Sequence, residues 1–207
     1  MLYVFTFAKK GSERIPYKNI KKFLELPLIE HTFKHFSQLS WTFPSAKFFC
    51  VSDFEEIENI SRAYRVKYID ETKLRSKTFN KKIKEVFRNE KITIDEHDVI
   101  VLLQPTSPIR FIDIIISQIR VYTKSDFDLA FSVYPVKKSN YYYDNKLINA
   151  DKDIIYQETG SYYFFNKKTL ELKYFMESDN YVFLQDSYCI DLDEVDEWNQ
   201  CELILKK

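Results

Sequence analysis

The stretch Val99-Ile100-Val101-Leu102-Leu103 decides the fold class of this 207-residue chain. A strand that is apolar on both faces is typical of the interior of a parallel sheet covered by helices on both sides. The stretch is far shorter than the ~18 apolar residues that a membrane-spanning helix needs. We therefore expect it to be a buried strand in the interior of a sheet.

Strand-like and helix-like segments alternate on both sides of this stretch. We expect strands at residues 2–8, 47–51, 66–69, 99–103 and 128–133. Apolar residues at helical spacing predict helices that begin at Pro27, after a Ser52 or Asp53 cap, at Thr78 and at Ile112. This alternation predicts an α/β fold, a three-layer, mostly parallel sheet with helices on both faces.

The pattern changes from residue 134 onward, where a small β lobe is expected. The segments predicted there are a β-hairpin at 141–148, strands at 160–165, 181–183 and 188–190, and a final helix capped by Asp193. No linker rich in Gly, Pro or Ser divides the sequence. We expect one domain over residues 1–207, with a small β-hairpin lobe near 134–158.

The charge balance argues against a nucleic-acid-binding protein. The chain has 31 basic and 31 acidic side chains and a pI of about 6.8, whereas proteins that bind the nucleic-acid backbone usually carry a basic excess. Neither a membrane helix nor a signal peptide is recognisable. The three cysteines, Cys50, Cys189 and Cys201, have no metal-ligand spacing and suggest reduced thiols. We expect a cytoplasmic protein with no nucleic-acid or membrane partner.

Only two glycines, Gly11 and Gly160, occur in the chain, where average usage would give about fourteen. Glycine is needed where the backbone is left-handed or where another group approaches it closely. We therefore expect each glycine to occupy a position where a side chain does not fit.

The loop after the first strand has the composition of a phosphate-binding loop. Residues 8–19 contain Gly11, Ser12 and four cations, at positions 9, 10, 14 and 18. Backbone N–H groups near a glycine, together with basic side chains, are what a polyphosphate requires. The spacing fits neither a Walker A loop nor the dinucleotide fingerprint. A solvated surface loop is the alternative interpretation.

The loop after the central strand has a backbone restrained by Pro105 and Pro108. Gln104 and Thr106 are therefore expected to be held toward a ligand at the carboxyl edge of the sheet, where open parallel sheets bind their ligands. The alternative is that Thr106 or Ser107 merely caps the next helix.

Two carboxylates alternate near the end of the chain, Asp191 and Asp193. Alternate residues of an extended segment point the same way, and two oxygen ligands on one side suit Mg²⁺. Asp193 also precedes a predicted helix, so an N-cap is the alternative role for its side chain.

These segments resemble a known family. Residues 8–19 read Ala-x-x-Gly-Ser-x-x-Ile-Pro-x-Lys-Asn, and residues 103–110 read Leu-Gln-Pro-Thr-Ser-Pro-Ile-Arg. Both resemble the nucleotide loop and the signature loop of the acylneuraminate cytidylyltransferases, the CMP-sialic acid synthetase family; seven of the eight residues at 103–110 match. Weaker similarities lie at residues 51–53, 159–164 and 188–193.

The resemblance implies an enzyme with a nucleotide-diphospho-sugar transferase-like fold. It would be a cytidylyltransferase that activates a nonulosonic (sialic-acid-like) sugar with CTP and releases a CMP-sugar and pyrophosphate. CTP and an acidic sugar would be its partners and Mg²⁺ its cofactor, and the resemblance allows a homodimer.

The resemblance also assigns roles to residues. The triphosphate would be bound by Lys9, Gly11, Ser12 and Lys18, and the nucleoside would face Ala8 and Asn19. The sugar would contact Gln104, Thr106 and Gly160, and Mg²⁺ would be held by Asp191 and Asp193. Lys18, Lys9 and Asp193 are the expected catalytic residues. Lys18 and Asp193 must then face one cleft, because both are assigned to the same triphosphate and metal ion.

The sequence departs from the family at three places. Lys9 stands where the family usually has Arg, so a bidentate phosphate contact becomes a point charge. Residues 70–74 replace the family's Arg-Pro-x-Glu-Leu, and the segment 136–155 is shorter than the family's lobe. The alternatives are therefore a cytidylyltransferase for a Kdo-like acid or a polyol phosphate, or a catalytically degenerate nucleotide-binding relative.

Two further interpretations receive little support. A glycosyltransferase would need an acidic metal motif after a central strand, and residues 99–110 contain none. His31 and His35 share a predicted helix face, but no third zinc ligand is evident.

Overall fold

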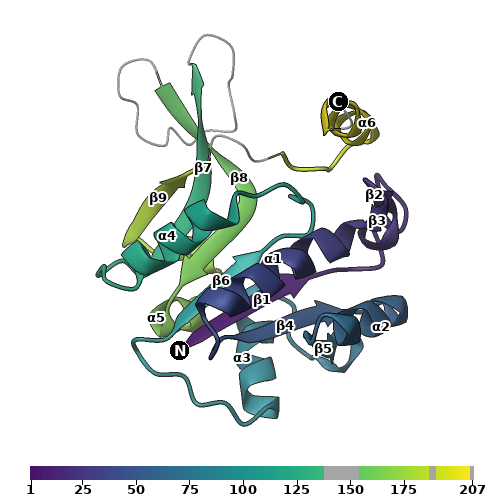
Figure 1. Ribbon diagram of the computed structural model, residues 1–207. Helices are drawn as coiled ribbons and strands as arrows, with labels where there is room; N and C mark the ends of the chain where they lie inside the picture. The colour runs from purple at the N-terminus through teal and green to yellow at the C-terminus, as the bar shows by residue number, and fades with distance from the viewer. Residues whose placement is uncertain (138–153, 187–189, 206–207) are drawn as a thin grey trace.

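The computed structural model describes residues 1–137, 154–186 and 190–205 and centres on a seven-stranded sheet (Figure 1). In spatial order the strands are β5 (Lys67–Asp70), β4 (Lys47–Ser52), β1 (Leu2–Phe7), β6 (Val99–Leu103), β8 (Ile154–Phe165), β7 (Leu129–Lys137) and β9 (Tyr181–Gln185). Only the pairs that include β8 are antiparallel among these strands. The expected mostly parallel sheet is confirmed, and β6 lies at its centre.

Helices cover both faces of the sheet, so the molecule has three layers (Figure 1). The first face carries α1 (Leu28–Thr42), α2 (Glu55–Ala63) and α4 (Ile112–Tyr122), and the second carries α3 (Phe79–Asn89) and α5 (Lys167–Glu171). Neighbouring residues of β1 enter different cores, since Val4 packs in the first and Phe5 in the second. Both side chains are fully buried, as the two-residue period of a strand between two helical layers requires.

The segment between β4 and α2 fastens the first loop to the sheet and does not cap the helix. The Ser52 hydroxyl donates to the Ala8 carbonyl at 2.5 Å, and the Asp53 carboxylate accepts from the Lys10 amide at 2.6 Å. Neither side chain caps α2, which begins at Glu55. The predicted cap is therefore wrong, because both side chains make tertiary contacts with the first loop.

A short hairpin, β2 (Lys22–Phe23) and β3 (Leu26–Pro27), links the first loop to α1. Sequence analysis did not predict it. Its turn residues Leu24 and Glu25 have φ of 46° and 72°, values at which hairpin turns usually have Gly or Asn. Pro27 ends the hairpin and directly precedes α1, one residue away from its expected place.

The final helix, α6 (Val195–Leu205), packs on this hairpin. Phe23, Leu192 and Trp198 are buried together in a small apolar cluster that also includes Ile15 of the first loop. This cluster joins the segment 190–205 to the first loop, although the two are far apart in the sequence (Figure 1).

Strand β8 changes its partner along its length. Tyr162–Phe165 pair with β6, whereas Ile154–Glu158 pair with β7 alone, and the register shifts opposite Ser132. Gly160, with φ +69°, lies in this irregular stretch. Irregular pairing of this kind bends a strand and re-aims its residues. Beyond the bend, β7 and β8 continue past the other strands as a two-stranded arm (Figure 1).

Several expectations concern the second half of the chain. The predicted hairpin at 141–148 and residues 188–189 of a predicted strand lie outside the described residues, and Ile190 is not in a strand. β7 and β8 are longer than expected.

No described helix has the length and hydropathy needed to cross a membrane.

Candidate active site

Lys18 and Asp193 lie in direct contact at the carboxyl edge of the sheet. The Lys18 ammonium donates to Asp193 Oδ1 at 2.7 Å and to the Leu192 carbonyl at 3.0 Å. Lys18 is 8% exposed, so this cation is held largely out of water. Lys18 and Asp193 therefore lie side by side, as their assignment to one ligand requires.

The backbone around Lys18 explains its position. Tyr17 adopts a left-handed conformation, with φ 55°, and a single 3-10 turn, Lys18–Ile20, follows it. Ile15 is buried beside Leu192 in the apolar cluster under α6. The turn therefore presents Lys18 to the segment 190–193.

Arg14 is a second cation at this site, and sequence analysis gave it no role. Its guanidinium donates to Asp193 Oδ2 and to Glu194 Oε1, both at 2.7 Å. The only sequence signal for Arg14 is its membership of the basic first loop. Both oxygens of Asp193 are thus paired, one with each cation. Partial burial alone would raise the pKa of Asp193, but the hydrogen bond from Lys18 and the charges of Lys18 and Arg14 outweigh burial and hold that pKa below its usual value.

The side chain of Asp193 does not cap α6. The Glu197 carboxylate accepts hydrogen bonds from the amides of Asp193 and Glu194, at 2.9 and 2.8 Å. Glu197 therefore satisfies the backbone donors at the start of the helix. The cap interpretation of Asp193 is wrong.

Asp191 is the other carboxylate of the predicted metal pair, and it is partly buried. Its Oδ1 is buried with no hydrogen-bond partner in the described part of the chain. Burial raises the pKa of Asp191; the Thr106 side chain partly offsets this, and the charge of Asp193 adds to it. An unpaired buried carboxylate oxygen is a fit position for a cation. Within the described ranges no three His, Cys, Asp or Glu side chains gather into a metal-binding group, so a metal ion here would have two protein carboxylates.

Gly160 lies directly beside Asp191. A Cβ placed on Gly160 would lie 3.3 Å from Asp191 Oδ2, and the backbone has φ +69°. The expectation that a side chain does not fit at this glycine is confirmed. At Gly11 the same expectation is wrong for the protein alone, since an added Cβ would meet no atom within 4 Å.

The loop after β6 forms backbone hydrogen bonds with both β8 and the C-terminal segment. The Gln104 amide donates to the Ser161 carbonyl at 2.9 Å, and the Thr106 carbonyl accepts from the Leu192 amide at 2.7 Å. Thr106 is thereby fixed next to the two carboxylates. The next helix, α4, follows Phe111 and has no side-chain cap, so the interpretation of Thr106 or Ser107 as a helix cap is wrong.

The remaining residues assigned to the nucleotide lie in the first loop. Lys9 is exposed, and its carbonyl accepts a hydrogen bond from Asn19 Nδ2 at 2.8 Å. Asn19 is buried, and its Oδ1 has no partner among the described residues. Ala8 is buried at the end of β1, and Ser12 is partly exposed. The loop thus presents the exposed Lys9 and Gly11 to solvent, whereas the amides of Lys10 and Ser12 already donate to Asp53 and to the Lys10 carbonyl.

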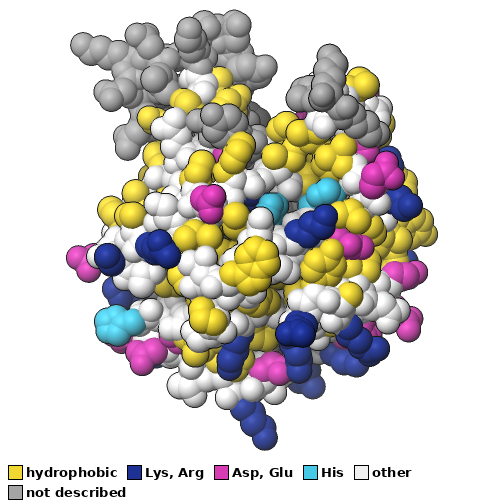
Figure 2. Space-filling view, viewed as in Figure 1, with side chains coloured by type: hydrophobic (Ala, Val, Ile, Leu, Met, Phe, Trp, Pro, Cys, Tyr) yellow, Lys and Arg dark blue, Asp and Glu magenta, His cyan; other side chains and the backbone are white. Residues whose placement is uncertain are grey.

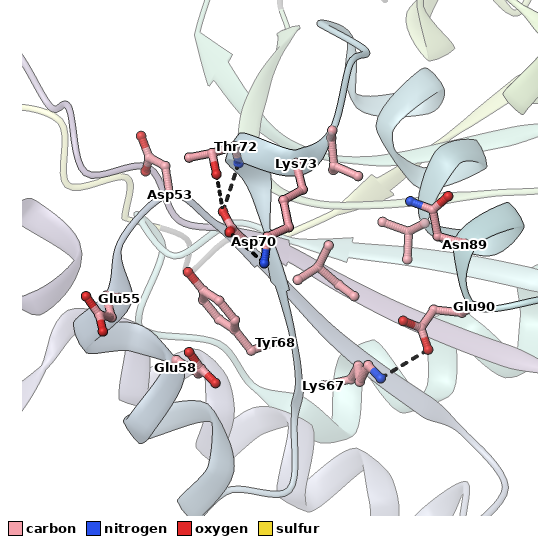
Figure 3. A pocket seen from close by; sticks show the side chains of 13 residues that line it. Asp53, Glu55, Glu58, Lys67, Tyr68, Asp70, Thr72, Lys73, Asn89 and Glu90 are labelled. Carbon is pink, nitrogen blue, oxygen red and sulfur yellow. Dashed lines mark hydrogen bonds and ion pairs between the residues drawn. The ribbon is translucent and has the colours of Figure 1, made fainter.

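A cavity of about 680 Å³ lies next to this loop, along the sheet edge formed by β5 (Figure 3). It runs between α2 and α3, and Asp53, which binds the Lys10 amide, is part of its wall. Its other walls include Asp70 and Thr72, where the backbone amide of Thr72 donates to the Asp70 carboxylate at 3.0 Å. These residues occupy the place of the family's Arg-Pro-x-Glu-Leu segment. None of the residues assigned above to nucleotide, sugar or metal lines this cavity.

The histidines of α1 are separate from the two carboxylates. His31 contacts the Phe23 carbonyl at 2.8 Å. Burial, with the charges of Arg110 and His31, lowers the pKa of His35 to about 3. Figure 2 shows histidine side chains near the centre of the face that carries α1. His35 is thus neutral at ordinary pH.

Solved structures show that this fold is shared with nucleotidyltransferases. The chain is similar to a CMP:2-keto-3-deoxy-manno-octonic acid synthetase complexed with CTP, at a TM-score of 0.72 and 13% identity, over 99% of this chain and 98% of that one. It is also similar to 4-diphosphocytidyl-2C-methyl-D-erythritol synthase from Anaerococcus prevotii, at a TM-score of 0.68 and 13% identity, over 100% of this chain and 96% of that one. A third similar structure is a putative glucose-1-phosphate thymidylyltransferase from Bacillus anthracis, at a TM-score of 0.67 and 11% identity, over 100% of this chain and 96% of that one. No curated protein matches the sequence.

The fold is therefore that of the α/β nucleotide-diphospho-sugar transferases. A family model described as cytidylyltransferase matches residues 7–206, nearly the whole chain. The chain therefore belongs to the cytidylyltransferase family of nucleotidyltransferases.

Proposed function

We propose that this cytidylyltransferase activates a nonulosonic, sialic-acid-like sugar. The anomeric hydroxyl of the sugar attacks the α-phosphorus of CTP and gives up its proton to solvent. The new P–O bond forms as the P–O bond to the leaving pyrophosphate breaks. The observation that carries the proposal is the contact of Lys18 with Asp193 between the two segments whose motifs resemble the acylneuraminate enzymes.

The first loop supplies charge and backbone donors to the triphosphate. Phosphoryl transfer requires mainly in-line positioning and compensation of charge on the phosphate oxygens. Lys9 and Lys18 provide cations, and the exposed Gly11 provides a backbone amide. The Ser12 amide already donates to the Lys10 carbonyl at 3.1 Å, so Ser12 contributes its hydroxyl. The open space at Gly11 lets phosphate oxygens approach the backbone. Ala8 and Asn19 face the nucleoside, and the buried, unpaired Asn19 Oδ1 is an acceptor suited to that contact.

Asp191 and Asp193 are the residues that would hold Mg²⁺. Mg²⁺ commonly takes one or two carboxylates together with phosphate oxygens and waters, so two protein ligands are enough. When bound, the ion supplies charge neutralisation at the phosphates and alignment of the attacking hydroxyl. The unpaired Asp191 Oδ1 is available as the chain stands, whereas Asp193 must exchange Lys18 or Arg14 for the ion.

The sugar is assigned to Gln104, Thr106 and Gly160. Thr106 is fixed by Leu192, and Gly160 leaves room beside Asp191 because it has no side chain. In the described part of the chain the Gln104 side chain makes no hydrogen bond, so its amide is available to a polar ligand.

A Kdo-like acid is the second candidate substrate. The synthetase at TM-score 0.72 is named for 2-keto-3-deoxy-manno-octonic acid. Both sugars are 2-keto acids whose anomeric hydroxyl adjoins a carboxylate, so the same site chemistry serves either. A polyol phosphate is the third candidate. Its support is the name of the similar structure at a TM-score of 0.68, a 4-diphosphocytidyl-2C-methyl-D-erythritol synthase.

Pyrophosphate release measures the reaction directly. The four nucleoside triphosphates would each be tested with N-acetylneuraminate and related nonulosonates, Kdo and polyol phosphates. We expect release with CTP and a nonulosonate. Release with Kdo or a polyol phosphate alone would replace the substrate assignment, and CTP binding without release from any acceptor would identify a degenerate relative.

A further inference from the structure

The Arg110 side chain joins three separate elements behind the site. Arg110 Nε donates to Ser161 Oγ at 3.0 Å, and one terminal nitrogen donates to the Ser161 carbonyl at 3.0 Å. The same nitrogen donates to the Gln104 carbonyl, and the other lies 3.5 Å from Thr32 Oγ1 of α1. The guanidinium therefore connects β8, α1 and the start of the loop after β6.

These contacts hold together the two ends of the loop that carries Gln104 and Thr106, the residues assigned to the sugar. Gln104 is the first residue after β6, and Arg110 is the last residue of the matched motif. The hydrogen bond from Arg110 to the Gln104 carbonyl ties the two ends together, so the backbone between them has a fixed span. The prolines at 105 and 108 restrict the same backbone from within.

The same guanidinium also fixes β8 where β8 passes the carboxylates. Ser161 follows Gly160, and Gly160 lies against Asp191. One side chain thus sets the distance between the loop with Gln104 and Thr106 and the strand next to Asp191.

We propose that Arg110 is a positioning residue that holds Gln104 and Thr106 in register with Gly160 and Asp191. The proposal rests on the proposed function, which assigns the sugar to Gln104, Thr106 and Gly160. Arg110 is 7% exposed and its fork is engaged inside the protein, so it acts through the loop and does not touch the sugar. The planar guanidinium reaches two carbonyls and a hydroxyl at once, a geometry that the single ammonium of Lys cannot reproduce.

Arg110→Lys tests this with charge retained. We expect KM for the sugar to rise, or kcat to fall, by about tenfold or more, because small displacements of reacting groups are costly. CTP affinity, measured by calorimetry without sugar, should stay within about twofold, since the hydrogen bonds that Arg110 makes to described residues go to Thr32, Gln104 and Ser161 and to no residue of the first loop. Arg62→Lys is the matched control, an exposed arginine paired with Glu58.

Hydrogen exchange gives a readout that does not depend on activity. In Arg110→Lys the amides of Gln104 and Ser107, which donate to the carbonyls of Ser161 and Gln104, should exchange at least about tenfold faster, while those of β1 stay unchanged. If the variant does not fold, Ser161→Ala removes only the Oγ acceptor and should give the same pattern with smaller changes. Added guanidinium should partly restore the sugar KM of Arg110→Ala.

The outcomes separate this proposal from the proposed function. Faster exchange confined to the amides of Gln104 and Ser107 supports positioning even if the wild type uses none of the tested sugars, in which case the proposed function alone fails. Unchanged exchange at the amides of Gln104 and Ser107 would overturn the positioning role. So would a fall in CTP affinity as large as the rise in the KM for sugar, together with a lowered Tm.

Discussion

The Lys18 ammonium lies 2.7 Å from the Asp193 carboxylate, although 175 positions separate them in the sequence. The pair exists because α6 packs on the β2–β3 hairpin and carries the segment 190–193 to the first loop. The site is therefore assembled from both ends of the matched region by an apolar cluster outside the main sheet.

Lys18→Ala should reduce turnover by about a hundredfold or more, the range for loss of one preorganised donor to a developing charge. Steady-state pyrophosphate release would measure it. Lys34→Ala, at an exposed position of α1, should leave turnover unchanged. A near-normal rate for Lys18→Ala would remove Lys18 from the reaction.

Asp193→Asn should raise the Mg²⁺ concentration needed for half-maximal activity, because the amide is a weaker ligand for a hard cation. Activity would be measured over a Mg²⁺ titration, alongside the Tm. A change in Tm alone would mean that Asp193 serves only to anchor Lys18 and Arg14.

Gly160→Ala should destabilise the fold by about 1–2 kcal/mol, since a residue with a Cβ is strained at this left-handed φ. The added methyl group would also crowd Asp191 Oδ2. Urea unfolding measures the first effect and Mn²⁺ binding the second. Wild-type stability in this variant would contradict the backbone conformation.

Gly11→Ala should leave stability within about 0.5 kcal/mol, because the new methyl group meets no protein atom. The same methyl group should weaken CTP binding if phosphate approaches the backbone there. Calorimetric titration with CTP decides this, and unchanged affinity would mean that the triphosphate does not contact Gly11.

Acid should destabilise the protein through His35. Its pKa is lowered to about 3 in the folded protein, against about 6.5 when unfolded. Between these values the unfolded chain binds the extra proton, so stability falls as pH drops, by about 1 kcal/mol per pH unit from this group. The free energy of unfolding would be compared at pH 7 and pH 5.

His35→Gln should show a smaller loss of stability between pH 7 and pH 5 than the wild type. His97→Gln is the control, since His97 is exposed and should leave the pH dependence as it is. Equal pH dependence in His35→Gln and the wild type would contradict the buried, neutral imidazole.

Local patterns predicted those parts of the fold that depend on local sequence. The five apolar residues at 99–103 and the strand–helix alternation predicted the sheet, because burial between two helical layers leaves a mark in the residues themselves. The β2–β3 hairpin was missed because Leu24 and Glu25 have none of the residue preferences of a left-handed turn. Apolar packing against α6 holds this turn instead.

The candidate site was predictable where motifs lie within one loop and not where contacts cross the chain. Lys18 and Asp193 followed from their motifs, and they meet. Ser52 and Asp53 resembled helix caps. In the structure, however, the Ser52 side chain binds the Ala8 carbonyl and the Asp53 side chain binds the Lys10 amide. Arg14 and Arg110 acquire their roles from Asp193 and Ser161, partners that no local pattern connects to them.

The apolar cluster under α6 also has a consequence for the order of events during translation. Lys18 leaves the ribosome long before Asp193, so for most of synthesis its ammonium has no acid partner. Docking of the late segment then buries a cation that was hydrated until that moment.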